Sequence, residues 1–315
     1  MRVSDYELLY DLPEGEYDGR KIDGVRTVTI RAGRSLEVMC HPIVRLSPEA
    51  RREAKARRTS EAMAKLNARN TERHMMRLTE ENFTPEAVVV TGTYPYPVED
   101  YGMCDLKELS ATYDRRGLPW EAERIRKDVR NWREKLRRRV IAAGGKAGDF
   151  KWLVRIEEGA EPPGVGLPPK YHFHAVVEGP GLDSETVKAL WEEKHGRAHC
   201  DRLDLNNDGA ARLARYLCKQ RRGGRWWSHS RNLRIPAPRV SDRKVSRRRA
   251  KLVAEDVRAN AQGVFDKVIQ RAYRGKYVCK VIEAKVTYSD YVNGVYIYVR
   301  MRLIEADRAM SPPEK

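Results

Sequence analysis

Hydrophobic and polar residues alternate along the first clearly patterned segment of the chain, residues 25–44. The alternation has the period of a β-strand and is broken by an Ala-Gly turn, so it predicts a β-hairpin. A short apolar run at residues 87–94 ends in small polar residues, and Pro95 and Pro97 follow it. Because proline cannot donate a hydrogen bond to a sheet, the run must stop there. We expect it to form a buried central strand.

Two more pairs of strands follow from the same pattern. Residues 150–158 and 171–178 are separated by a loop rich in Pro and Gly, which predicts an antiparallel hairpin. Residues 276–287 and 292–302 also alternate around a loop. We expect this last pair to pack against the rest of the protein or to extend its central sheet.

Helical periodicity separates these strands. The stretches that predict helices are residues 47–78, 119–143, 183–195 and 209–220. In the second of them, apolar residues recur on one face and basic residues fill the other, and a Gly pair ends the helix. Strands and helices do not alternate as regular βαβ units. The pattern therefore predicts an α+β fold with a central antiparallel sheet flanked by helices.

The balance of charged residues indicates what kind of partner the protein binds. Of the 315 residues, 41% are hydrophobic and 34% are charged, and the formal net charge is +17. The basic residues are clustered, and between residues 221 and 251 the one acid is Asp242. Such a balance is typical of proteins that bind nucleic acid. The alternative is a solvated surface that is merely rich in Lys and Arg.

Five cysteines are widely scattered and include no Cys-x-x-Cys pair, so neither a zinc ribbon nor a disulfide framework is expected. His195, His199 and Cys200 form only a weak zinc-like cluster. The first residues contain no apolar core of a signal peptide, and no run of 18 apolar residues occurs. We therefore expect a cytoplasmic protein without membrane contact.

The sharpest candidate for chemistry is His172-Phe173-His174 within a predicted strand. Side chains two residues apart on a strand point to one face, so both imidazoles can reach one metal ion. A His-x-His pair alone is weak evidence, but the preceding strand ends in Glu157 and Glu158. We favour Glu157 as the third ligand and keep Glu158 as the alternative. Two imidazoles and a carboxylate suit Mg²⁺ or, better, Mn²⁺.

A candidate nucleophile follows on the helix predicted at residues 209–220. Tyr216 and Lys219 stand three residues apart and share a helix face. Nearby cations and a metal-polarised phosphate favour attack by a phenolate. The surrounding arginines are Arg212, Arg215, Arg221 and Arg222. The competing interpretation is that Tyr216 is an ordinary packing residue of an amphipathic helix.

The order of these features resembles that of HUH endonucleases, the rolling-circle replication initiators related to filamentous phage gene II protein. The first motif of that family is an apolar strand with threonines, here residues 88–94. The second is His-hydrophobic-His, here His172 to His174, and the third is Tyr-x-x-Lys, here Tyr216 to Lys219. The resemblance implies an HUH/RRM-like palm with extra N- and C-terminal strands. The implied regions are residues 1–82 (hairpin and basic helix), 83–235 (nickase) and 236–315 (basic helix and strands).

The resemblance also implies a function. The protein would nick single-stranded DNA at a replication origin, keep the 5′ phosphate on Tyr216 and leave a 3′-OH primer. Lys219 would neutralise charge, and a host helicase and a host polymerase would be partners. Residues expected to contact DNA are Thr91, Thr93, Arg212, Arg215, Arg221, Arg222, Arg225 and Trp226. The neighbouring Trp227 is expected either to stack on bases or to pack in the protein.

Three departures from the family pattern stand out. Gly92 replaces what is often Leu or Phe, the loop between Glu157 and His172 is long, and Arg212 stands where a second tyrosine would be. The last departure indicates a single-tyrosine enzyme. The alternatives are a conjugative relaxase, a single-tyrosine transposase, and a non-catalytic DNA-binding regulator in which the histidines are structural.

Overall fold

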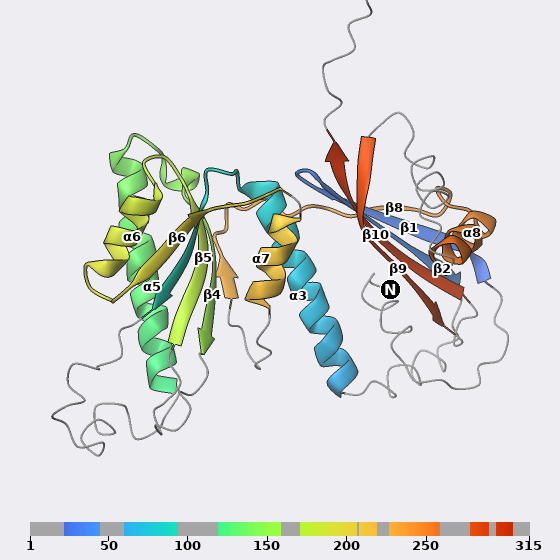
Figure 1. Cartoon of the computed structure of the whole chain (residues 1–315), viewed down its shortest axis with the longest axis horizontal. Coiled ribbons are helices and arrows are strands. Elements are labelled where there is room, and N and C mark those ends of the chain that lie inside the picture. The colour runs from blue at the N-terminus through green and yellow to red at the C-terminus, as the bar shows by residue number, and fades with distance from the viewer. Residues whose placement is uncertain are drawn as a thin grey trace, which may run out of the picture. The chain divides into compact units, whose positions relative to one another are not determined.

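The chain folds into two compact units. Unit 1 comprises Met1–Glu81 together with Ile235–Lys315, and unit 2 comprises Asn82–Arg234. The computed structural model describes residues 22–44, 60–93, 119–158, 171–206, 208–218, 227–258, 278–289 and 294–304. Each unit contains a five-stranded antiparallel sheet with helices beside it (Figure 1). The predicted α+β class is therefore confirmed.

Unit 2 is built on a sheet with the strand order β6-β3-β5-β4-β7. Its elements are β3 (Val88–Thr93), α5 (Pro119–Ala142), the short 3-10 helix η1 (Ala147–Asp149), β4 (Lys151–Glu158), β5 (Tyr171–Glu178), α6 (Ser184–Glu192), β6 (Ala198–Arg202), α7 (Gly209–Leu217) and β7 (Trp227–His229). The predicted hairpin is confirmed, because β4 and β5 pair antiparallel. The predicted central strand is β3, which lies between β5 and β6.

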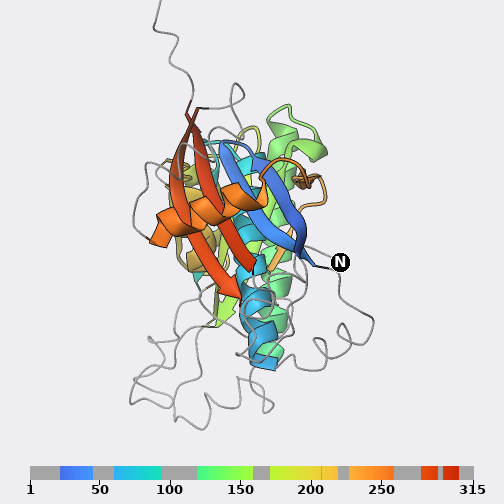
Figure 2. The ribbon, with the colours of Figure 1, turned by 90° about the vertical axis from the view of Figure 1, so that its right-hand side faces the viewer.

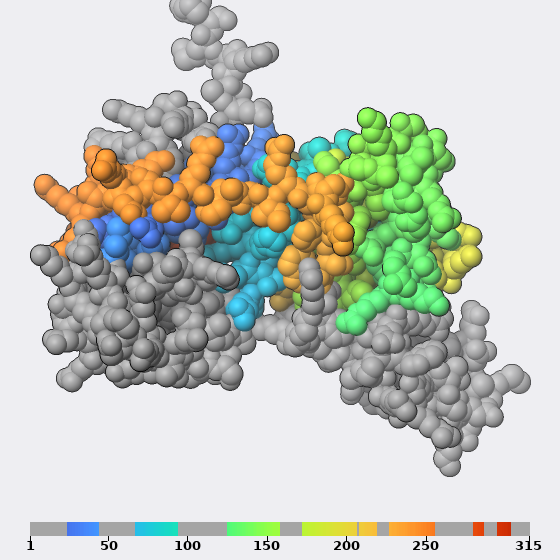
Figure 3. Space-filling model, turned by 180° about the vertical axis from the view of Figure 1, so that it is seen from behind, coloured from blue at the N-terminus to red at the C-terminus, as the bar shows by residue number. Residues whose placement is uncertain are grey.

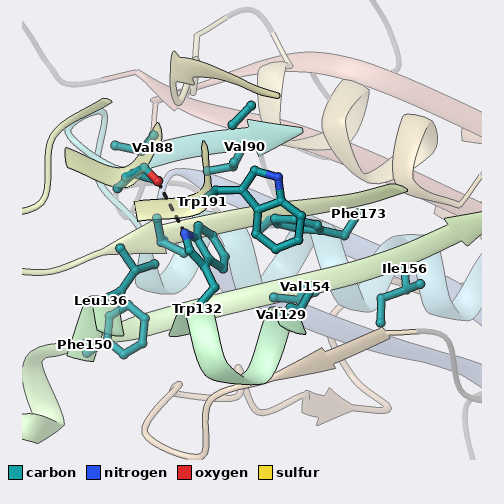
Figure 4. Packing of buried hydrophobic residues seen from close by; sticks show 14 of the residues in the cluster. Val88, Val90, Val129, Trp132, Leu136, Phe150, Val154, Ile156, Phe173 and Trp191 are labelled. Carbon is teal, nitrogen blue, oxygen red and sulfur yellow. Dashed lines mark hydrogen bonds between the residues drawn. The ribbon is translucent and has the colours of Figure 1, made fainter. Parts of the chain in front are cut away.

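An aromatic core covers one face of this sheet (Figure 4). The ring of Phe173 lies 5.1 Å from that of Trp132 on α5 and 4.7 Å from that of Trp191 on α6. The indole of Trp132 donates a hydrogen bond of 3.3 Å to the carbonyl of Val187. The apolar face predicted for α5 is buried throughout, and its residues are Ile125, Val129, Trp132, Leu136 and Val140. Since side chains alternate along β5, the residues on either side of Phe173 face away from this core.

Unit 1 joins the two ends of the chain in one sheet with the order β8-β1-β2-β10-β9. Its elements are β1 (Ile22–Ala32), β2 (Ser35–Val44), α3 (Ser60–Asn82, whose last residue belongs to unit 2), β8 (Arg239–Ser241), α8 (Arg247–Arg258), β9 (Val278–Ser289) and β10 (Gly294–Ile304). The predicted N-terminal hairpin and the final pair of strands are both confirmed, and β10 pairs with β2.

At the turn between β1 and β2, Gly33 has a φ of 51°, and a Cβ there would lie 2.1 Å from the carbonyl oxygen of Glu80. Only glycine fits both conditions.

The two faces of this second sheet differ in polarity. Under α8 lies an apolar cluster that includes Val38, Val253 and Val299. On the opposite face, the buried carboxylate of Glu37 pairs with Arg77 of α3 and accepts a hydrogen bond of 2.6 Å from the hydroxyl of Tyr298. Burial and the charge of Glu37 raise the pKa of Tyr298 far above its usual value. A buried polar network therefore fixes α3 on the sheet.

The structure differs from the sequence predictions in several elements. The helix predicted at residues 47–78 is described from Ser60 and ends at Asn82, and its predicted start lies outside the described residues. The sequence did not predict β6, β7 and β8, because three to five residues are too few for a clear alternation. Residues placed in a first and a third region by the sequence belong to one unit. No helix in the described part of the chain is long and apolar enough to cross a membrane.

Candidate metal centre

The hairpin of β4 and β5 brings a carboxylate and two imidazoles together on the sheet face opposite the aromatic core. Glu157 lies directly opposite His172 in the strand register. Its Oε2 atom is 3.4 Å from Nε2 of His172 and 3.6 Å from Nε2 of His174. The three potential ligand atoms all lie within 4.8 Å of one another. The predicted cluster therefore exists, and it contains Glu157, the carboxylate that we favoured as the third ligand.

The cluster is buried and carries charge. Glu157 is 7% exposed and His174 is 2% exposed. Burial alone would raise the pKa of Glu157, but the two nearby imidazoles hold it at about 2. Oε1 of Glu157 and Nε2 of His174 are buried without a hydrogen-bond partner within the described residues. Buried polar atoms normally find a partner, and a divalent cation between Glu157 and the imidazoles would supply one to Nε2 of His174.

The neighbouring strand β3 orients one of the imidazoles. Thr91 lies opposite His174, and its Oγ1 is 2.9 Å from Nδ1 of that ring. This contact leaves Nε2 directed at Glu157, as in metal sites where the second ring nitrogen is held by a hydrogen bond. Thr93 lies opposite His172, and its backbone N–H donates to the carbonyl of Arg197 at 2.9 Å. Both threonines, expected to contact DNA, thus lie on the strand beside the cluster.

The candidate nucleophile lies against this cluster. The ring of Tyr216, on α7, is 4.9 Å from the ring of His174 between centroids, edge to face. Tyr216 is 54% exposed, so its phenol is open to solvent while its ring contacts the buried ring of His174. The position of α7 depends on Gly209, because a Cβ there would lie 1.8 Å from the carbonyl oxygen of Asp204. Glycine therefore allows the loop before α7 to pass close to the start of the helix.

The two arginines beside Tyr216 are already paired. Arg212 contacts the carboxylate of Asp204 at 2.6 Å, and Arg215 contacts that of Asp208 at 3.1 Å. Both pairs are exposed and tie α7 to the loop before it, so these arginines shape the site as well as adding charge. The other predicted site residues, Lys219, Arg221, Arg222, Arg225 and Trp226, lie outside the described residues.

One residue of the site was missed from the sequence, and the position of a second, Trp227, was not predicted. Arg155 is 7% exposed, and its Nε lies 3.5 Å from Oε1 of Glu157. The alternation of β4 already placed it on the face of Glu157, so that signal was available. Trp227 lies opposite Arg155 on β7, and its ring stacks on His229 with centroids 5.6 Å apart. A strand of three residues gave no signal for this placement.

The weaker zinc-like cluster does not assemble. His195 packs on Trp191, and its Nδ1 is 3.7 Å from a carboxylate oxygen of Asp128. His199 is exposed and pairs with Asp201 at 2.9 Å, whereas Cys200 packs against the aromatic core on the other face of β6. Within the described residues, the group of Glu157, His172 and His174 is the one that can hold a metal ion.

Comparison of the chain with protein-family models, curated proteins and solved structures found no match. The class of the protein therefore follows from its own fold and site. It is a two-unit α+β protein, and one sheet carries a carboxylate and two imidazoles placed to hold a metal ion. A solvent-open tyrosine contacts this cluster from the adjacent helix.

Proposed function

We propose that the protein is a metal-dependent, single-tyrosine endonuclease of the HUH type that nicks single-stranded DNA to start rolling-circle replication. The observation that carries the proposal is the contact of the Tyr216 ring with His174, itself part of the cluster with Glu157 and His172. A histidine pair on a sheet and a tyrosine on the helix over the same face support an HUH palm for unit 2. The sequence order of the three motifs supports the same assignment.

Glu157, His172 and His174 would hold the metal ion. Two imidazoles and one carboxylate leave coordination positions open, which suits Mn²⁺ and also Mg²⁺. When bound, the ion would supply Lewis-acid polarisation of the scissile phosphate. The charge of Arg155 lies 3.5 Å from one carboxylate oxygen of Glu157, and Thr91 contacts Nδ1 of His174, so these two residues would help to position the ligands before DNA arrives.

Tyr216 would perform the covalent step. Its phenolic oxygen attacks phosphorus in line, the new Oη–P bond forms, and the bond from phosphorus to the 3′ oxygen breaks. The phenolic proton passes to solvent, and the departing 3′ oxygen takes up a proton to become the 3′-OH primer. Because the tyrosyl phosphodiester conserves the energy of the broken bond, the reverse reaction can reseal the strand. A solvent-open phenol beside buried ligands suits a substrate as large as a DNA strand.

Other residues would hold the single strand near the site. Trp227 lies on β7 opposite Arg155, on the face of the cluster, where an indole can stack on an unpaired base. The net charge of +17 favours contact with phosphates. Lys219 would neutralise charge on the phosphate. The sequence contains no GxxxxGK[ST] loop, so we expect a host helicase to open the duplex and a host polymerase to extend the primer.

The test is a covalent-adduct assay. Labelled single-stranded oligonucleotides that tile the replicon carrying the gene are incubated with the protein and Mn²⁺, Mg²⁺ or EDTA, and the products are separated on a denaturing gel. We expect a slowly migrating protein–DNA adduct that requires metal. Tyr216→Phe abolishes the adduct because the nucleophilic oxygen is removed. Tyr296→Phe, the same change at a buried tyrosine of unit 1, retains it.

The outcome that contradicts the proposal is also specific. If the wild-type protein binds these oligonucleotides but gives neither adduct nor nick with either metal, the enzyme assignment fails. The non-catalytic DNA-binding regulator then becomes the better interpretation. An adduct that persists in Tyr216→Phe would instead assign the nucleophile to another residue.

A further inference from the structure

Unit 1 carries a dense group of exposed basic side chains on β8, on α8 and on the turn between them. This group, the α8 basic surface, comprises Arg239, Arg243, Arg247, Arg248, Arg249 and Lys251. Figure 3 shows the segment in orange at the surface of the molecule, beside the blue hairpin of β1 and β2. In the described part of the chain, none of its five arginines forms an ion pair. Lys251 lies 3.9 Å from Glu255.

The acid in the turn between β8 and α8 already forms an ion pair. Asp242 lies between Arg239 and Arg243 in the sequence, and both of its oxygens accept hydrogen bonds of 2.7 Å from the guanidinium of Arg26. This bidentate pair lowers the pKa of Asp242 and ties the turn before α8 to β1. The pairing therefore fixes the turn and leaves the arginines of the α8 basic surface without a neutralising charge.

The helix presents its arginines outward. Ala250 and Val253 are buried against the sheet, and α8 lies across the strands of unit 1 (Figure 2). Arg247, Arg248 and Arg249 form the first helical turn, and all three are exposed. Three cations at the positive end of a helix repel one another and oppose the helix dipole. Bound anions relieve both effects, so the arrangement favours a polyanionic partner.

The chemistry of the surface favours duplex over single-stranded DNA. No residue from Arg239 to Arg258 is aromatic, whereas single-strand sites usually stack bases on aromatic rings. Arginines that contact phosphate oxygens position a protein on a duplex without reading its sequence. A helix of 12 residues spans about 18 Å, which suits contact along a groove edge.

We propose that the α8 basic surface is a second nucleic-acid interface, which binds the phosphate backbone of duplex DNA. It belongs to unit 1 and shares no residue with the metal cluster of unit 2. The proposal therefore stands apart from the nicking chemistry. In a protein that nicks one strand, such a surface would hold the double-stranded DNA that borders the opened site.

The test compares two triple variants of the full chain with the wild type. R247Q/R248Q/R249Q removes three charges from the α8 basic surface, and K127Q/R130Q/R139Q removes three exposed charges from α5 of unit 2. Fluorescence anisotropy measures binding to a 20-base-pair DNA duplex of arbitrary sequence, to a single strand of the same length and to an RNA duplex, at several salt concentrations. Circular dichroism and thermal unfolding establish that all three proteins are folded.

We expect the α8 variant to lose duplex affinity and to show a shallower salt dependence. Each phosphate contact contributes a slope of roughly 0.9 in log K against log salt, so three lost contacts lower the slope by about 2.7. The α5 variant changes the slope far less. Single-strand adduct formation persists in the α8 variant. If no protein forms an adduct, the proposed function fails but this binding result still stands.

Three outcomes would overturn the proposal. The first is unchanged duplex affinity and salt slope in R247Q/R248Q/R249Q. The second is an equal loss in K127Q/R130Q/R139Q, which would show that net charge alone drives binding. The third is a loss confined to the single strand, or a preference of the wild type for the RNA duplex. The first outcome would show that these arginines do not contribute to binding. The second and third outcomes would show that they do not form an interface for duplex DNA.

Discussion

At the scale of single residues, the Glu157, His172 and His174 side chains are held ready for a cation. Mn²⁺ at about 100 times its dissociation constant should stabilise the folded protein by about 2.7 kcal/mol. In a domain of the size of unit 2, this stabilisation corresponds to a rise of roughly 5–10 °C in the melting temperature. His174→Ala should abolish the rise, whereas His199→Ala, at an exposed histidine of the same sheet, should keep it. Calorimetry measures both, and a rise retained in His174→Ala would exclude this group as the site.

Thr91 provides a second prediction at the residue scale. When Nε2 of His174 binds a cation, Nδ1 carries the proton and donates it to Oγ1 of Thr91, 2.9 Å away. Thr91→Val should therefore weaken Mn²⁺ binding by about 10- to 100-fold, and Thr91→Ser should restore most of it. Titration calorimetry gives the affinities. Thr93→Val is the matched control, and an equal loss in that variant would indicate a general disturbance of β3.

At the scale of elements, the pairing of β3 with β5 depends on a glycine. Gly92 lies opposite Phe173, and a Cβ at Gly92 would lie 2.1 Å from the aromatic ring. With the ring of Phe173 in this place, position 92 has no room for a side chain. Gly92→Ala should lower the free energy of unfolding by about 1–3 kcal/mol, because the ring must move within a filled core.

Chemical denaturation measures this change, and Gly148→Ala serves as its control. Gly148 has no atom within 4 Å of a Cβ position, so its replacement should leave the free energy of unfolding nearly unchanged. Combining Gly92→Ala with Phe173→Leu should cost less than the sum of the two single changes, because the smaller side chain removes the overlap. Additive costs would show that the ring does not limit this position.

At the scale of the whole molecule, unit 2 has its own sheet and its own aromatic core. We expect a fragment of residues 82–234 to unfold cooperatively and to bind Mn²⁺ with the affinity of the full chain, since all three candidate ligands lie within it. Thermal unfolding followed by circular dichroism and titration calorimetry test this. A fragment without a cooperative transition would show that unit 2 needs unit 1 to fold.

Local periodicity in the sequence was sufficient to predict much of the fold and the grouping of the three candidate ligands. Alternation placed His172 and His174 on one strand face and Phe173 on the other, because strand geometry fixes the direction of each side chain. The same argument placed Glu157 at the end of the paired strand. Helical spacing predicted the buried face of α5. The Ala-Gly turn that ends at Gly33 predicted the N-terminal hairpin, because a tight hairpin turn requires a backbone conformation that glycine adopts readily.

Only the tertiary structure decided which distant residues meet. The contact of Tyr216 with His174 joins residues far apart in the sequence, and no local pattern encodes their distance. The pairing of β10 with β2, which unites the two ends of the chain, is of the same kind. Short strands such as β7 form because a neighbouring edge offers hydrogen bonds, rather than because their own residues alternate. The sequence alone determined the local directions of side chains, and long-range packing determined their neighbours.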